Sequence, residues 1–233
     1  MAERSAPRTA RERVRAQLTA EIVEVARTHL GTSGAAALSL RAVARELGMV
    51  SSAVYRYFPS RDDLLTTLII EGYDALGEAA ERAAAAVPAS DLLGRWLAVF
   101  TAAREWALAR PHEYALLYGS PVPGYSAPQD TTGPAGRVAL LLAGILRDGL
   151  ASGAITAAPG DDEAIILPGL LADLGLPEDT NLGTRVVQAW SGLFGAISFE
   201  LFGHTHNVVV DHEKYFHEVA TALAADAGLP SLG

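Results

Sequence analysis

The sequence predicts an all-α protein made of a small N-terminal helical domain and a larger helical body. Half of its 233 residues are hydrophobic, so a sizeable core can be buried. Ala and Leu dominate the composition, and long stretches contain neither Gly nor Pro, which is typical of helices. Apolar residues recur at helical spacing, and no strand-like alternation or internal repeat is visible.

The N-terminal end reads as a basic arm followed by one long helix. We expect residues 1–9 to be flexible. The helix that follows has apolar residues near one face, at positions Val14, Leu18, Ile22, Val25 and Leu30. Gly31, Ser33 and Gly34 interrupt this pattern, and we therefore expect the helix to end near them.

Two short helices and a fourth, longer helix follow. Ser39 is the expected N-cap of the second helix, and Gly48 ends it with a residue that tolerates a left-handed conformation. The third helix is expected over 51–58, because Pro59 disfavours helical geometry in the residue before it. Ser60, with an acid three positions later, is typical of a cap that starts a helix running towards Ala86.

In the body, the apolar periodicity predicts helices at about 89–110, 111–118, 134–152, 161–175, 184–203 and 212–227. The segment Gly119–Gly136 contains four Pro and four Gly and is expected to be a long loop. Long loops in compact domains are often mobile or functional.

Charge is distributed unevenly along the chain. The net charge is −9, yet residues 1–62 hold ten Arg against six carboxylates, a net charge of +4, and the remainder carries −13. This asymmetry indicates a DNA-binding end on an acidic body. The absence of Cys excludes disulfides, iron–sulfur clusters and thiolate zinc sites. No apolar run reaches membrane length and no secretory signal is visible, so we expect a soluble cytoplasmic protein.

The stretch from Ser39 to Phe58 has the pattern of a helix-turn-helix. In its second helix, Ala53, Val54 and Phe58 can face inwards. The residues left outside are Ser51, Ser52, Tyr55, Arg56 and Tyr57. Small hydroxyl residues at a helix start permit close approach to base edges, and Tyr hydroxyls and Arg are suitable phosphate donors. As an alternative, the tyrosines are amphipathic surface aromatics and Arg56 is a solvated charge.

The run LSLRAVARELGMVSSAVYRYFPSRDDLL resembles the signature of the TetR family of regulators, and the match covers about residues 18–68. The resemblance implies a DNA-binding domain over 1–62, a sensing and dimerisation domain over 63–233, and a helix from Ser51 that enters the major groove. It assigns DNA contact to Ser39, Arg41, Ser51, Ser52, Ala53, Tyr55, Tyr57 and Arg61. To these positions we add Arg56 from its place in the pattern.

Two positions depart from the family pattern. Tyr57 stands where the family often has His, and Ala53 offers only a methyl group for base readout. The arginines of the N-terminal end either follow the DNA or belong to a solubilising tail; they are Arg4, Arg8, Arg11, Arg13 and Arg15.

The last helical pair resembles the part of the family that forms a four-helix dimer interface. The segment 185–202 is apolar around most of its circumference, so it must be buried on two sides. Gly192 and Gly195 would let another helix approach closely, and the run after Trp190 resembles a subgroup with a Trp-x-Gly-type motif. The expected contacts are Trp190, Leu193, Phe194, Ile197 and Leu201. The alternative is a central helix in a monomeric core.

Large aromatic residues in the body are candidates for lining an effector cavity, although plain core packing explains each one singly. They are Trp96, Phe100, Trp106, Tyr114, Tyr118 and Trp190.

A histidine-rich stretch raises the question of a metal. The residues are His204, His206, Asp211, His212 and His217. They lie at a helix end and in a loop rather than on one face, so capping and surface polarity explain them better. We expect neither metal nor cofactor, and no catalytic motif is visible.

These observations predict a transcriptional regulator that is not an enzyme. We expect a homodimer that represses from a palindromic operator in double-stranded DNA and is released by a small-molecule effector, without a membrane partner. A helical enzyme fused to a DNA-binding end would need a catalytic constellation, and none is found. An adaptor that binds DNA but senses no ligand would have a packed body without a cavity.

Overall fold

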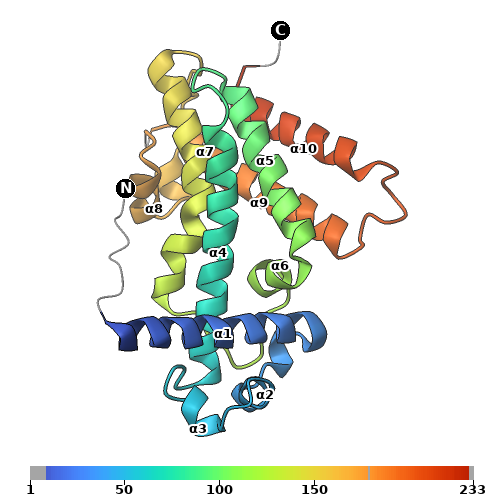
Figure 1. The fold of residues 1–233 in the computed structure, drawn as a ribbon. Helices are drawn as coiled ribbons and strands as arrows, with labels where there is room; N and C mark the ends of the chain where they lie inside the picture. The colour runs from blue at the N-terminus through green and yellow to red at the C-terminus, as the bar shows by residue number, and fades with distance from the viewer. Residues whose placement is uncertain (1–8, 178, 231–233) are drawn as a thin grey trace. The chain divides into compact units, whose positions relative to one another are not determined.

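The computed structural model describes residues 9–177 and 179–230, and Figure 1 shows its helices in chain order. Arg4 and Arg8 of the expected arm lie outside the described residues. No strand occurs in the described part of the chain; the β-bridge between Pro159 and Thr180 is isolated. The expected all-α class is confirmed.

Contacts between residues divide the chain into two compact units. The first is formed by Met1–Gly72 with His112–Thr131, and the second by Tyr73–Pro111 with Thr132–Gly233. The functional boundary expected after residue 62 stays a prediction. In the sequence, helix α4 (Arg61–Ala85) passes from the first unit into the second after Gly72.

The first unit is built on α1 (Ala10–Ser33), η1 (Ala35–Ala37), α2 (Leu40–Glu46), α3 (Ser51–Val54) and the start of α4. Helix α1 begins at Ala10 because Thr9 and Glu12 form a capping box, in which each side chain bonds the other residue's backbone N–H. Three arginines of the expected arm, Arg11, Arg13 and Arg15, therefore belong to this helix.

The first unit also contains α6 (Pro111–Tyr118), from His112 onwards, the loop after it and η2 (Gln129–Thr131). Leu116, Val122 and Tyr125 of this segment pack against the core formed by α1 to α4. Long-range packing of this kind leaves no local pattern in the sequence, which is why the loop was expected only as a connection within the body.

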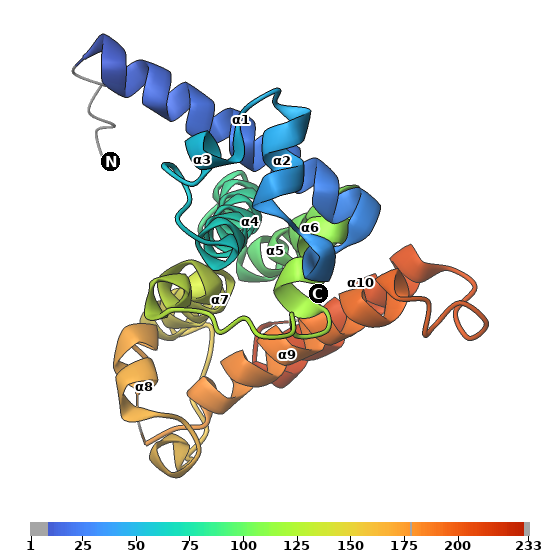
Figure 2. The ribbon, with the colours of Figure 1, turned by 90° about the horizontal axis from the view of Figure 1, so that it is seen from below.

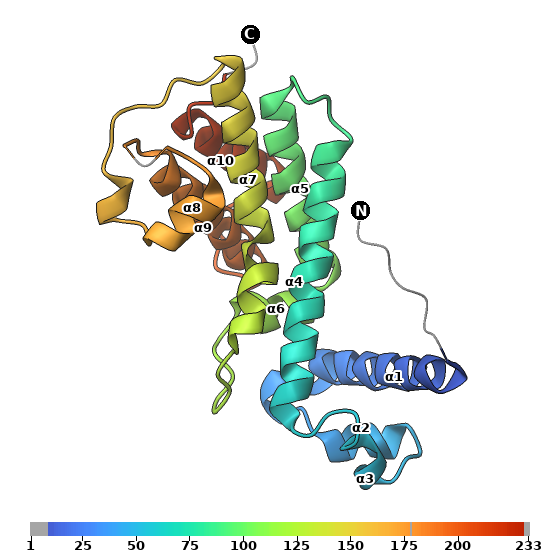
Figure 3. The same cartoon turned by 90° about the vertical axis from the view of Figure 1, so that its left-hand side faces the viewer.

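The second unit consists of the end of α4, α5 (Leu92–Ala109), α7 (Thr132–Ser152), η3 (Asp162–Ala164), α8 (Pro168–Leu174), α9 (Leu182–Leu201) and α10 (His212–Asp226). Figure 3 shows α7, α5 and the end of α4 side by side, with α9 and α10 behind them. Its core includes Trp96, Phe100, Leu142 and Leu193, none of which has exposed surface.

One helix expected in the body is divided, and the ends of α5, α7 and α9 differ from the expected ones by one to three residues. The helix expected over 161–175 is split into η3 and α8, because the residue before a proline avoids helical geometry and Leu167 accordingly has φ −58° and ψ 131°. Helix α7 begins at Thr132, two residues early, because Pro134 falls in its first turn, where a missing N–H costs no hydrogen bond. None of the helices in the described ranges is both long and apolar enough to cross a bilayer.

Candidate nucleic-acid interface

The turn between α2 and α3 is formed by a glycine in the left-handed region. Gly48 has φ +65°, and the amide of Met49 donates to the carbonyl of Ala44 at 2.8 Å, which closes the end of α2. L-residues with a side chain rarely adopt this conformation, so glycine is the residue that suits this position. The helix-turn-helix geometry expected from Gly48 is confirmed.

Helix α3 is shorter than expected. It spans Ser51–Val54, and the chain then continues as a hydrogen-bonded turn in which the amides of Tyr57 and Phe58 both donate to the carbonyl of Val54. Val54 has no exposed surface and Phe58 only 5%, so the inner side of this segment is anchored in the core of the first unit.

The outer side of α2 and α3 carries polar and cationic groups. Arg41, Ser52, Tyr55 and Arg56 are exposed, whereas Ser51 and Ala53 are half-buried. Ser39 occupies the expected N-cap position of α2, but its side chain makes no capping hydrogen bond. Its hydroxyl is therefore not committed to the helix end, which suits a residue that contacts DNA.

Tyr57 differs from Tyr55 in its surroundings. Tyr57 is half-buried against the core, and the guanidinium of Arg15 from α1 lies 5.7 Å from its ring centroid. This cation–π contact links α1 to the recognition segment. Tyr55 is 42% exposed and is the more accessible of the two hydroxyl donors.

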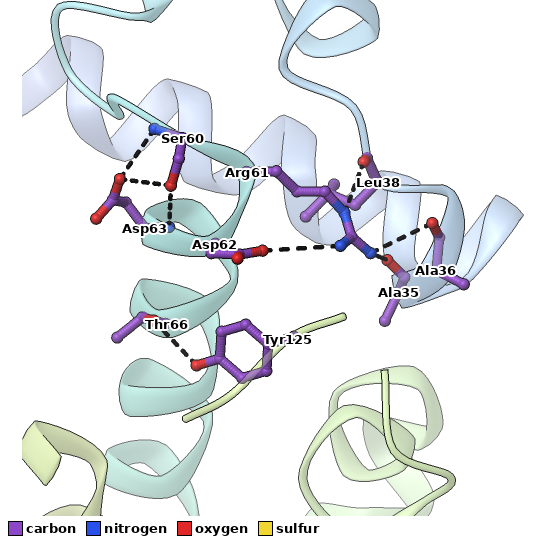
Figure 4. Close-up of polar contacts among 9 residues, drawn as sticks. All are labelled: Ala35, Ala36, Leu38, Ser60, Arg61, Asp62, Asp63, Thr66 and Tyr125. Carbon is purple, nitrogen blue, oxygen red and sulfur yellow. Dashed lines mark hydrogen bonds and ion pairs between the residues drawn. The ribbon is translucent and has the colours of Figure 1, made fainter. Parts of the chain in front are cut away.

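Arg61 points towards the backbone of the first unit (Figure 4). Its Nε donates to the carbonyl of Leu38 at 3.2 Å, and its Nη2 donates to the carbonyls of Ala35 at 2.9 Å and Ala36 at 3.3 Å. These bonds fasten η1 and the entrance of α2 to the first turn of α4. The expectation of a DNA contact did not include this structural role.

The start of α4 is capped as expected. The amide and hydroxyl of Ser60 donate to Oδ2 of Asp63 at 2.9 and 2.7 Å, and the amide of Asp63 donates to the Ser60 hydroxyl at 3.1 Å (Figure 4). One turn later, the hydroxyls of Thr66 and Tyr125 share a hydrogen bond of 2.9 Å. This bond joins α4 to the loop after α6.

Arg27 joins three helices of the first unit. From α1, its Nη2 contacts Glu71 of α4 at 2.9 Å and its Nε contacts Glu113 of α6 at 3.1 Å, while Nη1 bonds Glu24. Burial opposes the charge, but the three carboxylates outweigh it and raise the pKa of Arg27. No local sequence pattern singles out Arg27, since its partners on α4 and α6 lie 44 and 86 positions away.

The six aromatic candidates for an effector site are divided between the two units. Tyr114 and Tyr118 belong to the first unit and the others to the second. Trp96 and Phe100 are fully buried, their rings are stacked 5.4 Å apart, and the Trp96 indole donates to the carbonyl of Ala220. None of these six side chains lines the cavity between η1 and the loop after α6 or the cavity between α5 and α10.

Two tryptophans of the second unit have indole N–H groups without a partner. Trp106 is 4% exposed and Trp190 is half-buried, and the Nε1 atom of each is buried with no hydrogen-bond acceptor. A buried donor without a partner costs free energy, so such a group is a candidate for binding a ligand or a water molecule.

Two cavities bear on a ligand. One, of about 370 Å³, lies in the first unit between η1 and the loop after α6, with Ala35, Leu116 and Val122 in its wall. The other, of about 520 Å³, lies between α5 and α10 and includes Arg104 and Phe216. Arg104 donates to both carboxylate oxygens of Glu200, and this hydrogen bonding raises the pKa of the arginine.

Three of the five expected dimer contacts on α9 are buried within the protomer. Leu193 and Ile197 have no exposed surface and Phe194 has 6%, because these residues fill the core of the second unit. Trp190 and Leu201 are half-buried. This burial moves the candidate contact surface to the exposed side of the same helix, which carries Ser191, Gly195, Phe199 and, just beyond the helix end, Phe202.

Two of the glycines of α9, Gly192 and Gly195, lie on different sides of the helix. A Cβ on Gly192 would stand 2.7 Å from Cδ1 of Leu223, so this glycine allows α10 to pack closely. A Cβ on Gly195 would meet nothing within 4 Å. Gly195 thus leaves space on the outer side for a helix that the second unit itself does not supply.

The histidines at the end of α9 do not converge. Within the described ranges, no three His, Asp or Glu side chains are grouped as metal ligands would be. His212 shares a hydrogen bond of 3.1 Å with the hydroxyl of Thr205, and Asp211 caps α10 by accepting from the amide of Lys214 at 3.0 Å.

Comparisons with known proteins agree with this architecture. Residues 22–68 match the family described as bacterial regulatory proteins, tetR family, and residues 96–223 match the tetracyclin repressor-like C-terminal domain. The HTH-type transcriptional regulator Rv1816 of Mycobacterium tuberculosis is 44% identical over 203 residues, which are 83% of this chain and 84% of the relative.

Two solved structures are also similar. The regulatory protein SCO4313 has a TM-score of 0.77 and 34% identity, covering 93% of this chain and 100% of the other. RolR, solved in complex with its ligand resorcinol, has a TM-score of 0.55 over 95% of this chain and 99% of the other. Its identity is 16%, so this second likeness concerns the fold alone.

Proposed function

The chain belongs to the TetR family and is an HTH-type transcriptional regulator, and we propose that it is a repressor that binds a palindromic operator as a homodimer and is released by a small molecule. Regulators of this family are not enzymes. The observation that best supports DNA binding is the exposed polar surface on α2 and α3, which lies over the buried apolar core of the first unit. Its place of action is the cytoplasm, where bacterial DNA lies.

The proposed DNA contacts follow the exposure of each side chain, except at Ser39, which is half-buried but whose hydroxyl makes no capping hydrogen bond. Tyr55 and Arg56 bind phosphate, Ser52 approaches base edges, and Ser39 and Arg41 bind the backbone at the start of α2. Ser51, Ala53 and Tyr57 are half-buried and contribute mainly shape. Arg61 acts through the position of η1 rather than by a free guanidinium.

The proposed dimer uses the outer side of α9 and the adjoining side of α10. Phe199 of α9 is 57% exposed and Tyr215 of α10 is 46% exposed, so both helices present a large aromatic side chain outside the core of the protomer. A two-fold axis would place the same surface of a second copy against them. Two recognition helices could then reach half-sites about one helical turn, roughly 34–36 Å, apart.

The proposed effector is a small, mainly apolar molecule that carries a hydrogen-bond acceptor. This chemistry suits the second unit, where the indole donors of Trp106 and Trp190 have no acceptor. Resorcinol, the ligand of the structurally similar RolR, is a small aromatic molecule with oxygen atoms. A protein of the same fold thus binds a molecule of this class.

The link between effector and DNA runs through α6. A single residue, Arg110, separates the end of α5 in the second unit from α6, and α6 from His112 onwards packs within the DNA-binding unit. Glu113 of α6 pairs with Arg27 of α1, and Tyr125 bonds Thr66 of α4. A shift of the end of α5 would therefore reach the helices that carry α2 and α3.

The test begins with the operator. Genomic fragments retained by the purified protein would be sequenced, and we expect one short inverted repeat to be enriched. A reporter gene placed behind that repeat should be repressed by the protein. Enrichment without an inverted repeat would contradict the dimeric operator, and activation of the reporter would contradict repression. Operator binding that no small apolar compound weakens would favour an adaptor without a sensing role.

A further inference from the structure

We propose that the η3–α8 end of each protomer packs against the α9–α10 loop of its partner in the dimer. This contact is called the peripheral contact. This inference rests on the proposed dimer and adds a second, peripheral contact to it. The surfaces involved are defined here as the η3–α8 patch, which consists of Ile165, Leu167 and Leu170, and the loop patch, which consists of Phe202, Val208 and Val210.

Exposed apolar side chains are concentrated at these places. Eight of the ten exposed large hydrophobic residues in the described part of the second unit lie in the two patches or between them on α9 and α10. Leu167 is 77% exposed, Val208 78% and Val210 fully exposed. Each patch groups three exposed large apolar side chains, and clusters of this kind mark candidate interaction sites.

The two patches are held at opposite ends of α9 (Figure 2). At the first end, Asp162 of η3 accepts hydrogen bonds from the amides of Gly183 and Thr184 at 2.6 and 3.0 Å, which fixes η3 to the first turn. At the other end, the amide of Thr205 donates to the carbonyl of Phe199 at 3.3 Å, which folds the loop onto the last turn. The 20 residues of α9 separate these ends by about 30 Å.

The symmetry of the proposed dimer brings unlike ends together. If the exposed sides of two α9 helices face each other across a two-fold axis perpendicular to them, the helices run antiparallel. The first end of one copy then meets the last end of the other. By symmetry the contact occurs twice.

Charge favours this pairing over its alternative. Residues 161–179 contain six carboxylates and no Lys, Arg or His. The loop between α9 and α10, residues 202–211, contains one carboxylate, that of Asp211, and two exposed histidines, His204 and His206. A parallel arrangement would bring the two acidic ends together, and like charges repel. The antiparallel arrangement places each acidic end against a loop that has a single carboxylate, Asp211, which caps α10.

The chain has no cysteine, so single-cysteine variants allow a direct test. Leu167→Cys and Val208→Cys would be made separately in the full-length protein, mixed, allowed to exchange subunits, and treated with a short bis-maleimide. We expect the mixture to give a covalent dimer and neither variant alone to do so, since like ends lie far apart. Leu140→Cys on α7, an exposed apolar position outside both patches, is the matched control and should remain uncrosslinked with either partner.

Two further measurements separate this inference from the dimer itself. Sedimentation shows whether the protein is a dimer, and Gly195→Cys should crosslink with itself if the two α9 helices face each other. A monomer at micromolar concentration would overturn both the proposed dimer and the peripheral contact. If Gly195→Cys crosslinks with itself but the mixture of Leu167→Cys and Val208→Cys does not, the dimer stands and the peripheral contact is overturned. Crosslinking of Leu167→Cys with itself would also contradict it.

Discussion

Two arginines close to the recognition helix have different partners. Arg56 is exposed on the outer side of the turn after α3, where a phosphate can reach it. Arg61 donates to three backbone carbonyls inside its own unit. The same side chain can thus serve DNA binding at one position and the stability of the DNA-binding unit at the other, and substitutions should separate the two roles.

Arg56→Ala should weaken operator binding without changing the stability of the protein. Removing one phosphate contact also lowers the slope of log affinity against log salt concentration by about 1, because one fewer counterion is released. A titration of labelled operator at several salt concentrations measures both effects. Arg82→Ala, an exposed arginine of the second unit, is the control. An unchanged salt slope for Arg56→Ala would argue against a phosphate contact.

Arg61→Ala should destabilise the protein by roughly 1–3 kcal/mol, because charged hydrogen bonds are lost and three carbonyls lose their donor. Denaturant unfolding followed by circular dichroism measures the change. Arg41→Ala, which removes an exposed guanidinium from the same unit, should leave the unfolding midpoint nearly unchanged. Equal stabilities for the two variants would show that the Arg61 bonds contribute little to the fold.

At the scale of elements, α9 is a helix with one side buried in the protomer and the other side exposed. Its inner side fills the core with Leu193 and Ile197, and Gly192 lets α10 pack against it. Its outer side keeps Phe199 and Gly195 exposed. Gly192 and Gly195 are three positions apart and lie on different sides of the helix. The same substitution at Gly192 tests packing within the protomer, and at Gly195 it tests packing between protomers.

Gly192→Leu should destabilise the protomer by roughly 1–3 kcal/mol, since the added side chain collides with Leu223 and overpacks the α9–α10 contact. Gly195→Leu meets open space and gains helix propensity, so the protomer should be as stable as before or more stable by up to about 1 kcal/mol. Thermal unfolding and sedimentation distinguish them. We expect Gly195→Leu to weaken the dimer; a dimer of unchanged affinity would place the contact elsewhere.

For the whole molecule, the proposed regulation requires that effector binding in the second unit and operator binding by the first influence each other.

Arg137 contributes to the order of the second unit by joining α7 to α4. It bonds Glu81 and Asp74, and these hydrogen bonds, with Glu81 contributing most, raise its pKa. The coupling between sites must act through differences in effector affinity between two states of the protein.

An effector that binds the body should lower operator affinity by roughly 5–150-fold, and operator DNA should weaken effector binding by the same factor. All three tryptophans lie in the second unit, so quenching of their emission reports effector binding. Glu113→Gln, which weakens the contact of α6 with Arg27, should reduce this factor more than it reduces effector affinity. Equal coupling in the variant and the wild type would exclude the Arg27–Glu113 pair from the link.

The sequence by itself determined the features that are coded within a few neighbouring residues. Gly48 set the turn of the helix-turn-helix, Ser60 and Asp63 set the start of α4, and the pattern around Tyr55 identified the family. Each of these depends on backbone conformation or on side chains one turn apart, so a short stretch of sequence contains the whole cause.

Only the tertiary structure decided which partners distant residues have. The sequence showed that α9 is apolar all round but not that Leu193 and Ile197 face inwards and Phe199 outwards, because the choice depends on α5, α7 and α10 packing against it. It likewise gave no sign that Arg61 holds η1 or that Arg27 reaches Glu113. These contacts join residues 23 to 86 positions apart, and their energy depends on a geometry that exists only once the chain is folded.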